Sequence, residues 1–173
     1  MLTSTGKSPA QYDLPGAFLQ FGAFSIKGAQ PEMSTMNRQQ LQEISKKRVQ
    51  EAKLLLDGRH FDGCYYLLGI GVECAIKSAI AKQVNKHDFP DKSLAIDSYS
   101  HNLTQLMKTA GLWQQFEAEM RVAPALSLNW AVVKDWSVDR RYELGVSESV
   151  ARDFYSACTA RTHGVLSWLM KSW

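Results

Sequence analysis

From residue 36 to the end of the chain, apolar residues recur every three or four positions, and no stretch alternates strictly between apolar and polar residues. The first spacing places side chains on one face of an α-helix, whereas a half-buried strand needs a period of two. A chain without strand patterns buries its apolar faces by packing helix against helix. The sequence therefore predicts an all-α fold, an antiparallel up-and-down bundle of four main helices plus a short helix.

Capping and breaking residues mark the ends of the expected helices. Ser34 or Thr35 is the expected cap of the first helix, and Gly58 is its expected stop. Residues 86–100 contain several helix breakers and are expected to form a loop, while segment 125–136 fits either a helix or an extended segment. The expected helices span, in chain order, about 36–57, 60–85, 100–110, 112–121 and 147–171.

Residues 1–35 differ in composition from residues 36–173, which hold the helical pattern. The first part is rich in Pro, Gly, Ser and Thr and contains an apolar, aromatic run at 17–26. We interpret it as an N-terminal extension or arm, partly irregular. It is either an extended reading frame upstream of a start at Met33 or Met36, or an arm that docks its aromatic residues on a neighbouring molecule.

The charge balance of the chain is mild. Lysine and arginine number 20 against 17 aspartates and glutamates, which gives a formal net charge of +3. Dedicated nucleic-acid-binding domains usually carry a stronger basic excess, so the composition permits RNA contact without arguing for it. A membrane span needs about 18 or more consecutive apolar residues. No such run occurs, so we expect no membrane association.

The cysteines are Cys64, Cys74 and Cys158, and their odd number excludes a closed set of disulfides. No cysteine or histidine group has the spacing of a zinc site, so we expect neither a metal nor a cofactor. Cys64 and Cys74 lie inside apolar helical patterns, which favours buried free thiols. Free thiols are typical of a reducing cytoplasm, the compartment we expect.

Small and aromatic residues in the apolar pattern indicate close packing. Gly69 and Gly71 lie inside the second expected helix, where each costs about 1 kcal/mol relative to Ala. Close approach of another element is the expected compensation. Trp130, Trp136 and Trp168 are expected in the core or in a dimer contact rather than stacked on nucleic-acid bases.

Several segments, in a fixed order, together resemble the HEPN domain, a small helical domain of prokaryotic toxin–antitoxin and nucleotidyltransferase-associated proteins. The resemblance covers about residues 38–170. The segments are a basic Ala/Leu-rich helix at 52–56, the Glu73-x3-Lys77 helix at 61–77, the helix start His101-Asn102-Leu103, Trp136 with Arg140-Arg141-Tyr142, and a long closing helix. The resemblance implies an antiparallel bundle that commonly forms homodimers, beside a nucleotidyltransferase or another protein partner, with RNA as a possible ligand.

Many members of that family are metal-independent ribonucleases that carry Arg, four to six residues, then His near the start of the last helix. No His in this chain follows an Arg at that spacing. Arg161 and His163 are two residues apart and would face opposite sides of a helix. Arg152 and His163 share a face but lie about 16 Å apart along it, so only an antiparallel dimer would join them. We therefore expect no catalytic residue, and keep Arg152 and His163 as the remaining candidates.

The charged residues of the second helix and of the loop near residue 140 have two interpretations. In the structural one, Glu73 forms a buried ion pair with Arg141 or Arg140, because an Arg fork on a carboxylate tolerates burial. In the functional one, Lys77, Arg140 and Arg141 form a pocket for a nucleotide or RNA phosphate. His101 is expected to cap or pack at a helix start rather than to catalyse.

Three functions remain open from the sequence. The first is a non-catalytic, dimeric HEPN-like module that binds a partner protein, RNA or a nucleotide, in a toxin–antitoxin or defence-type system. The second is a metal-independent ribonuclease with a displaced active site using Arg152, His163 or Arg141. The third is a purely structural homo-oligomer that exchanges its N-terminal arm.

Overall fold

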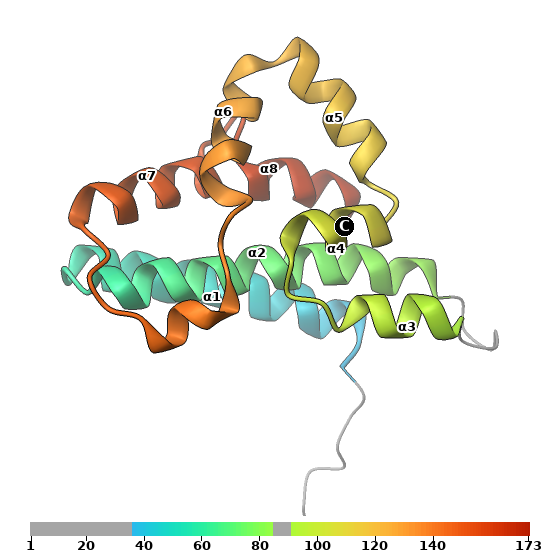
Figure 1. Cartoon of the computed structure of the whole chain (residues 1–173), viewed down its shortest axis with the longest axis horizontal. Helices are drawn as coiled ribbons and strands as arrows, with labels where there is room; N and C mark the ends of the chain where they lie inside the picture. Colours follow the sequence, from blue (N-terminus) through green and yellow to red (C-terminus); the bar gives the residue numbers. More distant parts are fainter. Residues whose placement is uncertain (1–35, 85–90) are drawn as a thin grey trace, which may run out of the picture. The chain divides into compact units, whose positions relative to one another are not determined.

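The computed structural model describes residues 36–84 and 91–173, which form helices joined by short loops without any β-strand (Figure 1). The predicted all-α class is confirmed for this part of the chain. The extension predicted for residues 1–35, with the caps Ser34 and Thr35, lies outside the described residues.

Eight α-helices and two short 3-10 helices make up the described part, rather than the five helices expected. They are α1 (Arg38–Asp57), α2 (Phe61–Gln83), α3 (Lys92–Ser98), α4 (Leu103–Thr109), α5 (Trp113–Val122), α6 (Pro124–Val133), η1 (Val138–Tyr142), α7 (Glu148–Thr159), α8 (Val165–Leu169) and η2 (Met170–Ser172).

Helix α1 begins at a capping box. The side chain of Asn37 accepts a hydrogen bond from the backbone N–H of Gln40 at 2.9 Å, and the Gln40 side chain accepts one from the Asn37 N–H at 2.9 Å. Two of the unpaired N–H groups of the first turn are thereby satisfied. Asn37 is therefore the cap, and the helix starts two residues later than the sequence suggested.

The turn between α1 and α2 differs from the expectation for Gly58. That glycine has φ −77°, whereas the next residue, Arg59, takes the left-handed conformation with φ +62°. The N–H of His60 donates to the carbonyl of Leu55 at 2.8 Å and closes the turn. A left-handed backbone conformation costs free energy in a residue with a Cβ, so the backbone is locally strained at Arg59.

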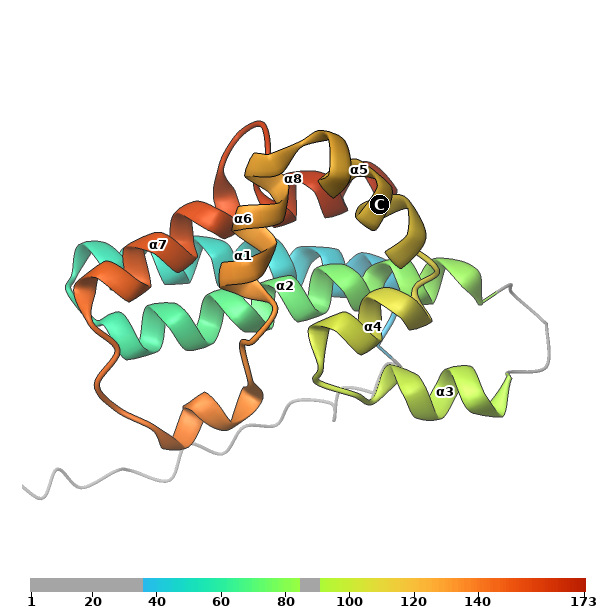
Figure 2. The ribbon, with the colours of Figure 1, turned by 45° about the horizontal axis from the view of Figure 1, so that its top comes forward.

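Helix α2 is the central element of the bundle. Thirteen of its 23 residues are buried, and it packs against α1, α4, α7, α8 and η1. Figures 1 and 2 both show α1 and α2 side by side along most of their length. Among the described helices, α2 alone is long and apolar enough to cross a membrane, yet 67% of that apolar window is buried in the bundle, as expected of a core helix.

The close packing predicted at the two glycines is present. A Cβ added at Gly69 would lie 2.0 Å from the indole of Trp136, so the ring lies directly on the helix backbone. Gly71 faces α1, where the nearest atom to an added Cβ is the Ser45 carbonyl oxygen at 3.4 Å. The Ser45 hydroxyl, itself buried, donates to the Gly71 carbonyl at 2.7 Å and joins the two helices.

The expected loop at 86–100 contains helix α3. Asp91 is one of the helix-breaking residues in that segment, yet its carboxylate accepts hydrogen bonds from the N–H groups of Ser93 and Leu94 and caps α3. Asp has both roles because its short acceptor bonds nearby backbone outside a helix interior. The short helix expected next, at about 100–110, is α4 (Leu103–Thr109), and Gly111 follows its C-terminal cap with φ +67°.

Segment 125–136, whose sequence fits either a helix or an extended segment, is helical as far as Val133, within α6. Pro124 occupies the first turn, where its missing N–H costs nothing. Trp130 and Trp168 both pack edge-on against Phe116, with ring centroids 5.1 and 4.6 Å away. Together with the buried Trp136, they confirm the expectation of core tryptophans.

The long final helix expected from Ser147 to residue 171 is broken in two. Its start is confirmed, since the Ser147 hydroxyl accepts the N–H of Val150 at 3.3 Å and caps α7. The break lies before α8, at Gly164. A Cβ there would lie 2.4 Å from the carbonyl oxygen of Ala160, so a glycine is required for the chain to turn so tightly.

Candidate functional site

The most polar cluster inside the bundle surrounds Glu73. This α2 residue is only 5% exposed, and a buried carboxylate requires partners. Lys77, one turn further on, places its Nζ 2.8 Å from one carboxylate oxygen. The Nδ1 of His101 lies 3.0 and 2.9 Å from the two oxygens. Glu73 is therefore held by two nitrogen donors from two different segments.

Helix α4 brings His101 to this carboxylate. Leu103 and Leu106 are fully buried, and α4 packs on α2 through this apolar side. The residue before α4, Asn102, is its cap, accepting the N–H of Gln105 at 2.8 Å. His101 directly precedes that cap, so it packs at the helix start, one of its two predicted roles, but does not cap it.

The hydrogen bond identifies one ring nitrogen of His101 that carries a proton. A carboxylate only accepts hydrogen bonds, so Nδ1 of His101 must carry the proton that points at Glu73. In the neutral ring, Nε2 is then left with a free lone pair. The side chain is half exposed, while Lys77 is mostly buried. Of the three residues, His101 is the one that meets solvent.

The predicted ion pair between Glu73 and Arg141 is wrong. The guanidinium of Arg141 lies over the ring of Tyr142, 4.7 Å from its centroid, and that of Arg140 lies 5.5 Å from the ring of Tyr65. Tyr65 precedes Glu73 by eight residues, or about 12 Å along α2. The loop that carries both arginines packs on the first half of α2, and the carboxylate lies in the second half.

The predicted phosphate pocket of Lys77, Arg140 and Arg141 is not assembled either. Lys77 is paired with Glu73, and Arg140 donates to Glu143 at 2.7 Å. The two cations are therefore paired with carboxylates on different elements, Lys77 on α2 and Arg140 on η1. Arg141 is exposed beside Tyr142 and has no carboxylate partner among the described residues.

The remaining catalytic candidates, Arg152 and His163, are also apart. Arg152 forms an ion pair at 2.8 Å with Glu148 in the first turn of α7. His163 lies in the turn after α7, where its carbonyl accepts a hydrogen bond from Asn129 at 2.8 Å. Because Arg161 and His163 are not helical, the prediction that they face opposite sides of one helix does not apply.

The cysteines behave as predicted. Cys64, Cys74 and Cys158 are free and buried. Burial raises the pKa of the Cys64 and Cys74 thiols to about 11 and that of Cys158 well above its usual range. Such thiols are poor nucleophiles and poor metal ligands at neutral pH. In the part of the chain that the structure describes, no three His, Cys, Asp or Glu side chains gather as metal ligands.

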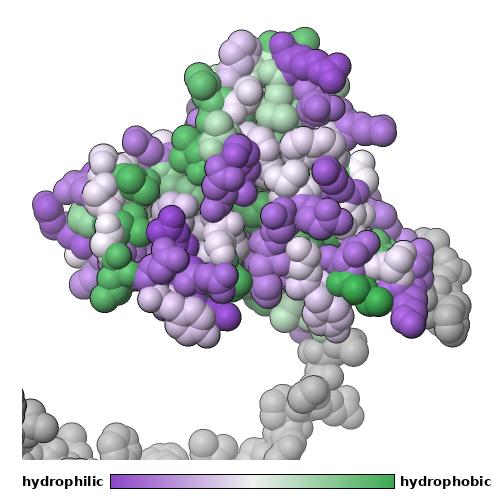
Figure 3. Space-filling model, viewed as in Figure 1, coloured by the Kyte–Doolittle hydropathy of each residue, from purple (hydrophilic) through white to green (hydrophobic). Residues whose placement is uncertain are grey.

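A surface that the sequence did not single out runs along α6. No charged residue occurs between positions 122 and 133. Leu126, Trp130 and Val133 face the core, but Leu128 is 70% exposed on the opposite side. Figure 3 shows apolar side chains gathered over α6. The ambiguous periodicity of this segment concealed the surface, because a helix with two apolar faces has no polar side to mark it.

Further exposed apolar residues occur in the same part of the sequence as α6. Six of the twelve large apolar residues exposed in the described chain lie within positions 122–150, and α6 packs against α7. They are Val122, Leu128, Val132, Tyr142, Leu144 and Val150. Leu128 and Val132 lie on α6 itself, and the others lie on α5, on η1, in the loop before α7 and on α7. A contiguous exposed apolar patch is typical of an interaction site, and α6 is where two of these residues share one helix.

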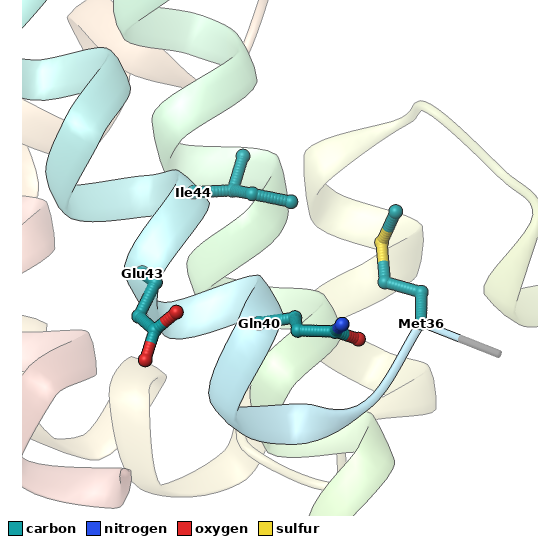
Figure 4. Close-up of a pocket in the computed structure, with 4 residues that line it drawn as sticks. All are labelled: Met36, Gln40, Glu43 and Ile44. Atoms are coloured by element: carbon teal, nitrogen blue, oxygen red, sulfur yellow. The ribbon is translucent and has the colours of Figure 1, made fainter. Parts of the chain in front are cut away.

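A hollow at the start of α1 carries little chemistry. Its lining comes from Met36, Gln40, Glu43 and Ile44, which all belong to the first turns of one helix and the residues before it (Figure 4). Gln40 belongs to the capping box, and Glu43 accepts a hydrogen bond from Gln39 at 2.9 Å. Neither a cation nor a nucleophile lines it among these residues.

The chain was compared with known protein families, curated proteins and solved structures. No family model, no curated protein and no solved structure matches it.

Proposed function

We propose that this chain is a non-catalytic, HEPN-like helical module whose function is to bind another protein through the exposed outer face of helix α6, around Leu128. The observation that carries this proposal is the uncharged helix α6, whose Leu128 faces solvent while Trp130 anchors it to the core. An exposed apolar helix face attached to a rigid core suits recognition of a second protein.

The HEPN-like part of the proposal draws support from the cluster around Glu73. Two segments of the resemblance, Glu73-x3-Lys77 and the His101-Asn102-Leu103 helix start, are 28 residues apart at Glu73 and His101, yet their side chains meet at hydrogen-bonding distance. Another segment of the resemblance, Arg140-Arg141-Tyr142, does not contact the cluster around Glu73. Members of the family that this chain resembles commonly form homodimers, and we propose the same for this chain. We also propose that it is cytoplasmic, because buried free thiols are typical of proteins from a reducing compartment.

Protein binding is favoured over RNA binding by the distribution of charge. The cations that flank α6 in the sequence are already paired, Arg121 with Glu117 and Lys134 with Asp135. An RNA site would need several cations free to meet phosphates. A toxin–antitoxin or defence-type partner, for example a nucleotidyltransferase, is the class of protein that the resemblance suggests.

Photo-crosslinking from α6 tests the proposal. A photoreactive phenylalanine analogue at position 128, expressed in the cells that encode the chain, is expected to give a protein adduct, and the same analogue at Leu54 is expected to give none. Leu54 is a matched control, because it is 72% exposed on α1. Equal adducts at both positions, or none at position 128, would contradict the proposed surface.

Labelled single-stranded RNA provides the competing test. We expect no binding in fluorescence anisotropy at about 50 mM or about 200 mM salt. Tight binding that collapses at the higher salt would replace the protein partner with RNA. A stable dimer with neither an RNA nor another protein partner would leave a purely structural homo-oligomer.

A second candidate function, metal-independent RNA cleavage, is favoured by one observation. Glu73 orients His101 through Nδ1 and leaves Nε2 free, an arrangement that suits a general base. The test is incubation with RNA in the presence of EDTA, beside the variants His101→Ala and His163→Ala. Cleavage lost only in His101→Ala would assign a displaced active site to His101. Absence of cleavage in every sample would leave the binding module.

A further inference from the structure

We infer that His101 is a phosphorylation site, at which the Nε2 atom accepts a phosphoryl group from a small donor of high transfer potential. This site goes beyond the proposed function and is separate from it, since His101 contacts α2 and does not belong to α6. Three observations carry the inference: the hydrogen bond that holds the imidazole, the exposure of the ring, and the charges around Glu73.

The fold holds the ring of His101 in one protonation pattern. Its Nδ1 lies 3.0 and 2.9 Å from the two carboxylate oxygens of Glu73, so the proton stays on Nδ1 and the lone pair of the neutral ring stays on Nε2. In the described part of the chain, no hydrogen bond holds the ring of His60 or His163. Such a ring exchanges its proton between both nitrogens, so its Nε2 is a nucleophile for only part of the time.

The ring of His101 is also accessible to a reagent. Its side chain is 50% exposed, whereas the Glu73 and Lys77 side chains are 7% and 19% exposed. The buried carboxylate occupies Nδ1, and Nε2 is the ring nitrogen without a partner among the described residues. His101 therefore combines a nucleophilic lone pair with access to solvent.

The transfer itself is a simple displacement at phosphorus. The lone pair of Nε2 forms a bond to phosphorus while the bond from phosphorus to the leaving atom breaks, and that electron pair stays with the leaving group. With zwitterionic phosphoramidate as the donor, the leaving group is ammonia, and no further proton is needed. The proton on Nδ1 stays in place, so the phosphorylated ring carries a positive charge. Nothing is oxidised or reduced.

Glu73 stabilises the positive charge that forms on the ring. Its carboxylate is 5% exposed, and the attraction between opposite charges is stronger away from water. Because it already accepts the Nδ1–H of His101, the positive charge develops beside a negative charge that is in place before the reaction. Glu73 is thus a positioning residue, which holds the ring and its proton without meeting the phosphoryl group.

Lys77 favours a phosphoryl group over an uncharged acyl group. With a neutral imidazole, the cluster has no net charge, because Lys77 offsets Glu73 at 2.8 Å. A substituent on Nε2, with the proton kept on Nδ1, makes the ring cationic and leaves the cluster with a net positive charge. The negative oxygens of a phosphoryl group offset that charge, and an acyl group does not.

Treatment of the full chain with phosphoramidate tests the site, with phosphorus NMR and peptide mapping by mass spectrometry as readouts. We expect His101 to react about tenfold faster than His60 or His163, which are matched controls within the same molecule. The dominant signal is expected to be absent in His101→Ala. In Glu73→Gln, which keeps the shape of the side chain without its charge, we expect the rate at His101 to fall about tenfold and the rate at His60 to stay the same.

The comparison among histidines of the wild type does not depend on how well a variant folds, and circular dichroism would show whether Glu73→Gln keeps its helices. Equal rates at the three histidines, no phosphate on His101, or an unchanged rate in folded Glu73→Gln would overturn the inference. Diethyl pyrocarbonate transfers an uncharged acyl group, and an equal preference of this reagent for His101 would contradict the choice of a phosphoryl group. None of these results changes the conclusion on α6.

Discussion

The α1–α2 pair and the segment from α6 to the start of α7 use apolar residues in opposite ways. In α1 and α2, the apolar residues turn inward, and Leu56, Leu68, Val72 and Ile76 are almost completely buried. In α6, the core residue Leu126 is matched by Leu128 on the outside, 70% exposed. The α1–α2 pair therefore buries its apolar side chains in the core, whereas α6 exposes some of its apolar side chains, which are available for contact with another molecule.

The buried polar side chains concentrate in the α1–α2 pair. Ser45, Glu73 and Ser78 lie on α1 and α2, and each is hydrogen-bonded within the bundle. In α6, the amide of Asn129 donates to the carbonyl of His163, in the turn after α7. We expect substitutions at α1–α2 contacts to change stability, and substitutions on the exposed face of α6 to change partner binding.

The largest expected effect on stability comes from Gly69→Ala. The added Cβ would meet the rigid indole of Trp136 at 2.0 Å, and we expect a loss of about 3 kcal/mol in the free energy of unfolding. Gly71→Ala is the matched control on the same helix. Its Cβ would make an ordinary contact at 3.4 Å, so a better helix former there should leave stability equal or higher. Urea denaturation measures both, and equal stabilities would contradict the packing of Trp136 on α2.

A smaller loss is expected from Glu73→Ala. Removal of the carboxylate leaves the mostly buried Lys77 and the Nδ1 of His101 without their acceptor, and we expect about 2 kcal/mol of destabilisation. A double-mutant cycle with His101→Ala measures the coupling between the two side chains. The matched comparison is Glu73→Ala with Arg141→Ala. If Arg141 rather than His101 coupled to Glu73, the observed cluster would be wrong.

The smallest expected effect is a pH dependence at the junction of α5 and α8. The Trp168 Nε1–H donates to Glu119 at 2.6 Å and, with Lys171, lowers the pKa of that carboxyl below its ordinary 4.5. A lowered folded pKa adds stability above about pH 4.5, and this part is lost as pH falls through the folded pKa. Glu119 is partly exposed, so we expect less than about 1 kcal/mol. Urea midpoints between pH 6 and pH 3 should show the wild type losing its advantage over Glu119→Gln; a constant difference would contradict this.

Helix class and most helix boundaries were predictable, because they depend on local periodicity and on caps such as Ser147 and Gly111. The break at Gly164 was not, since it depends on a backbone contact with Ala160 that no spacing reveals. Asp91 illustrates a third case, because one residue type both breaks and caps helices.

Prediction of the candidate site was limited in the same manner. Glu73, Lys77 and His101 were each identified, and the burial of Glu73 was anticipated. The partner was assigned to Arg141 because Arg best tolerates burial with a carboxylate. Which donor reaches Glu73 depends on how α4 and η1 pack along α2, a long-range property that the sequence pattern does not contain. The exposed apolar face of α6 was missed because both faces of this helix carry apolar residues.

The most direct test of the division between folding and binding surfaces is partner capture by two matched variants. Leu54 on α1 and Leu128 on α6 are 72% and 70% exposed, so a glutamate at either position should change stability by less than about 0.5 kcal/mol. Affinity purification of the full chain from the cells that encode it is expected to recover the same partner protein with the wild type and with Leu54→Glu, and to lose it with Leu128→Glu. If Leu128→Glu recovered the partner as the wild type does, or if Leu54→Glu alone lost it, α6 would not be the binding surface.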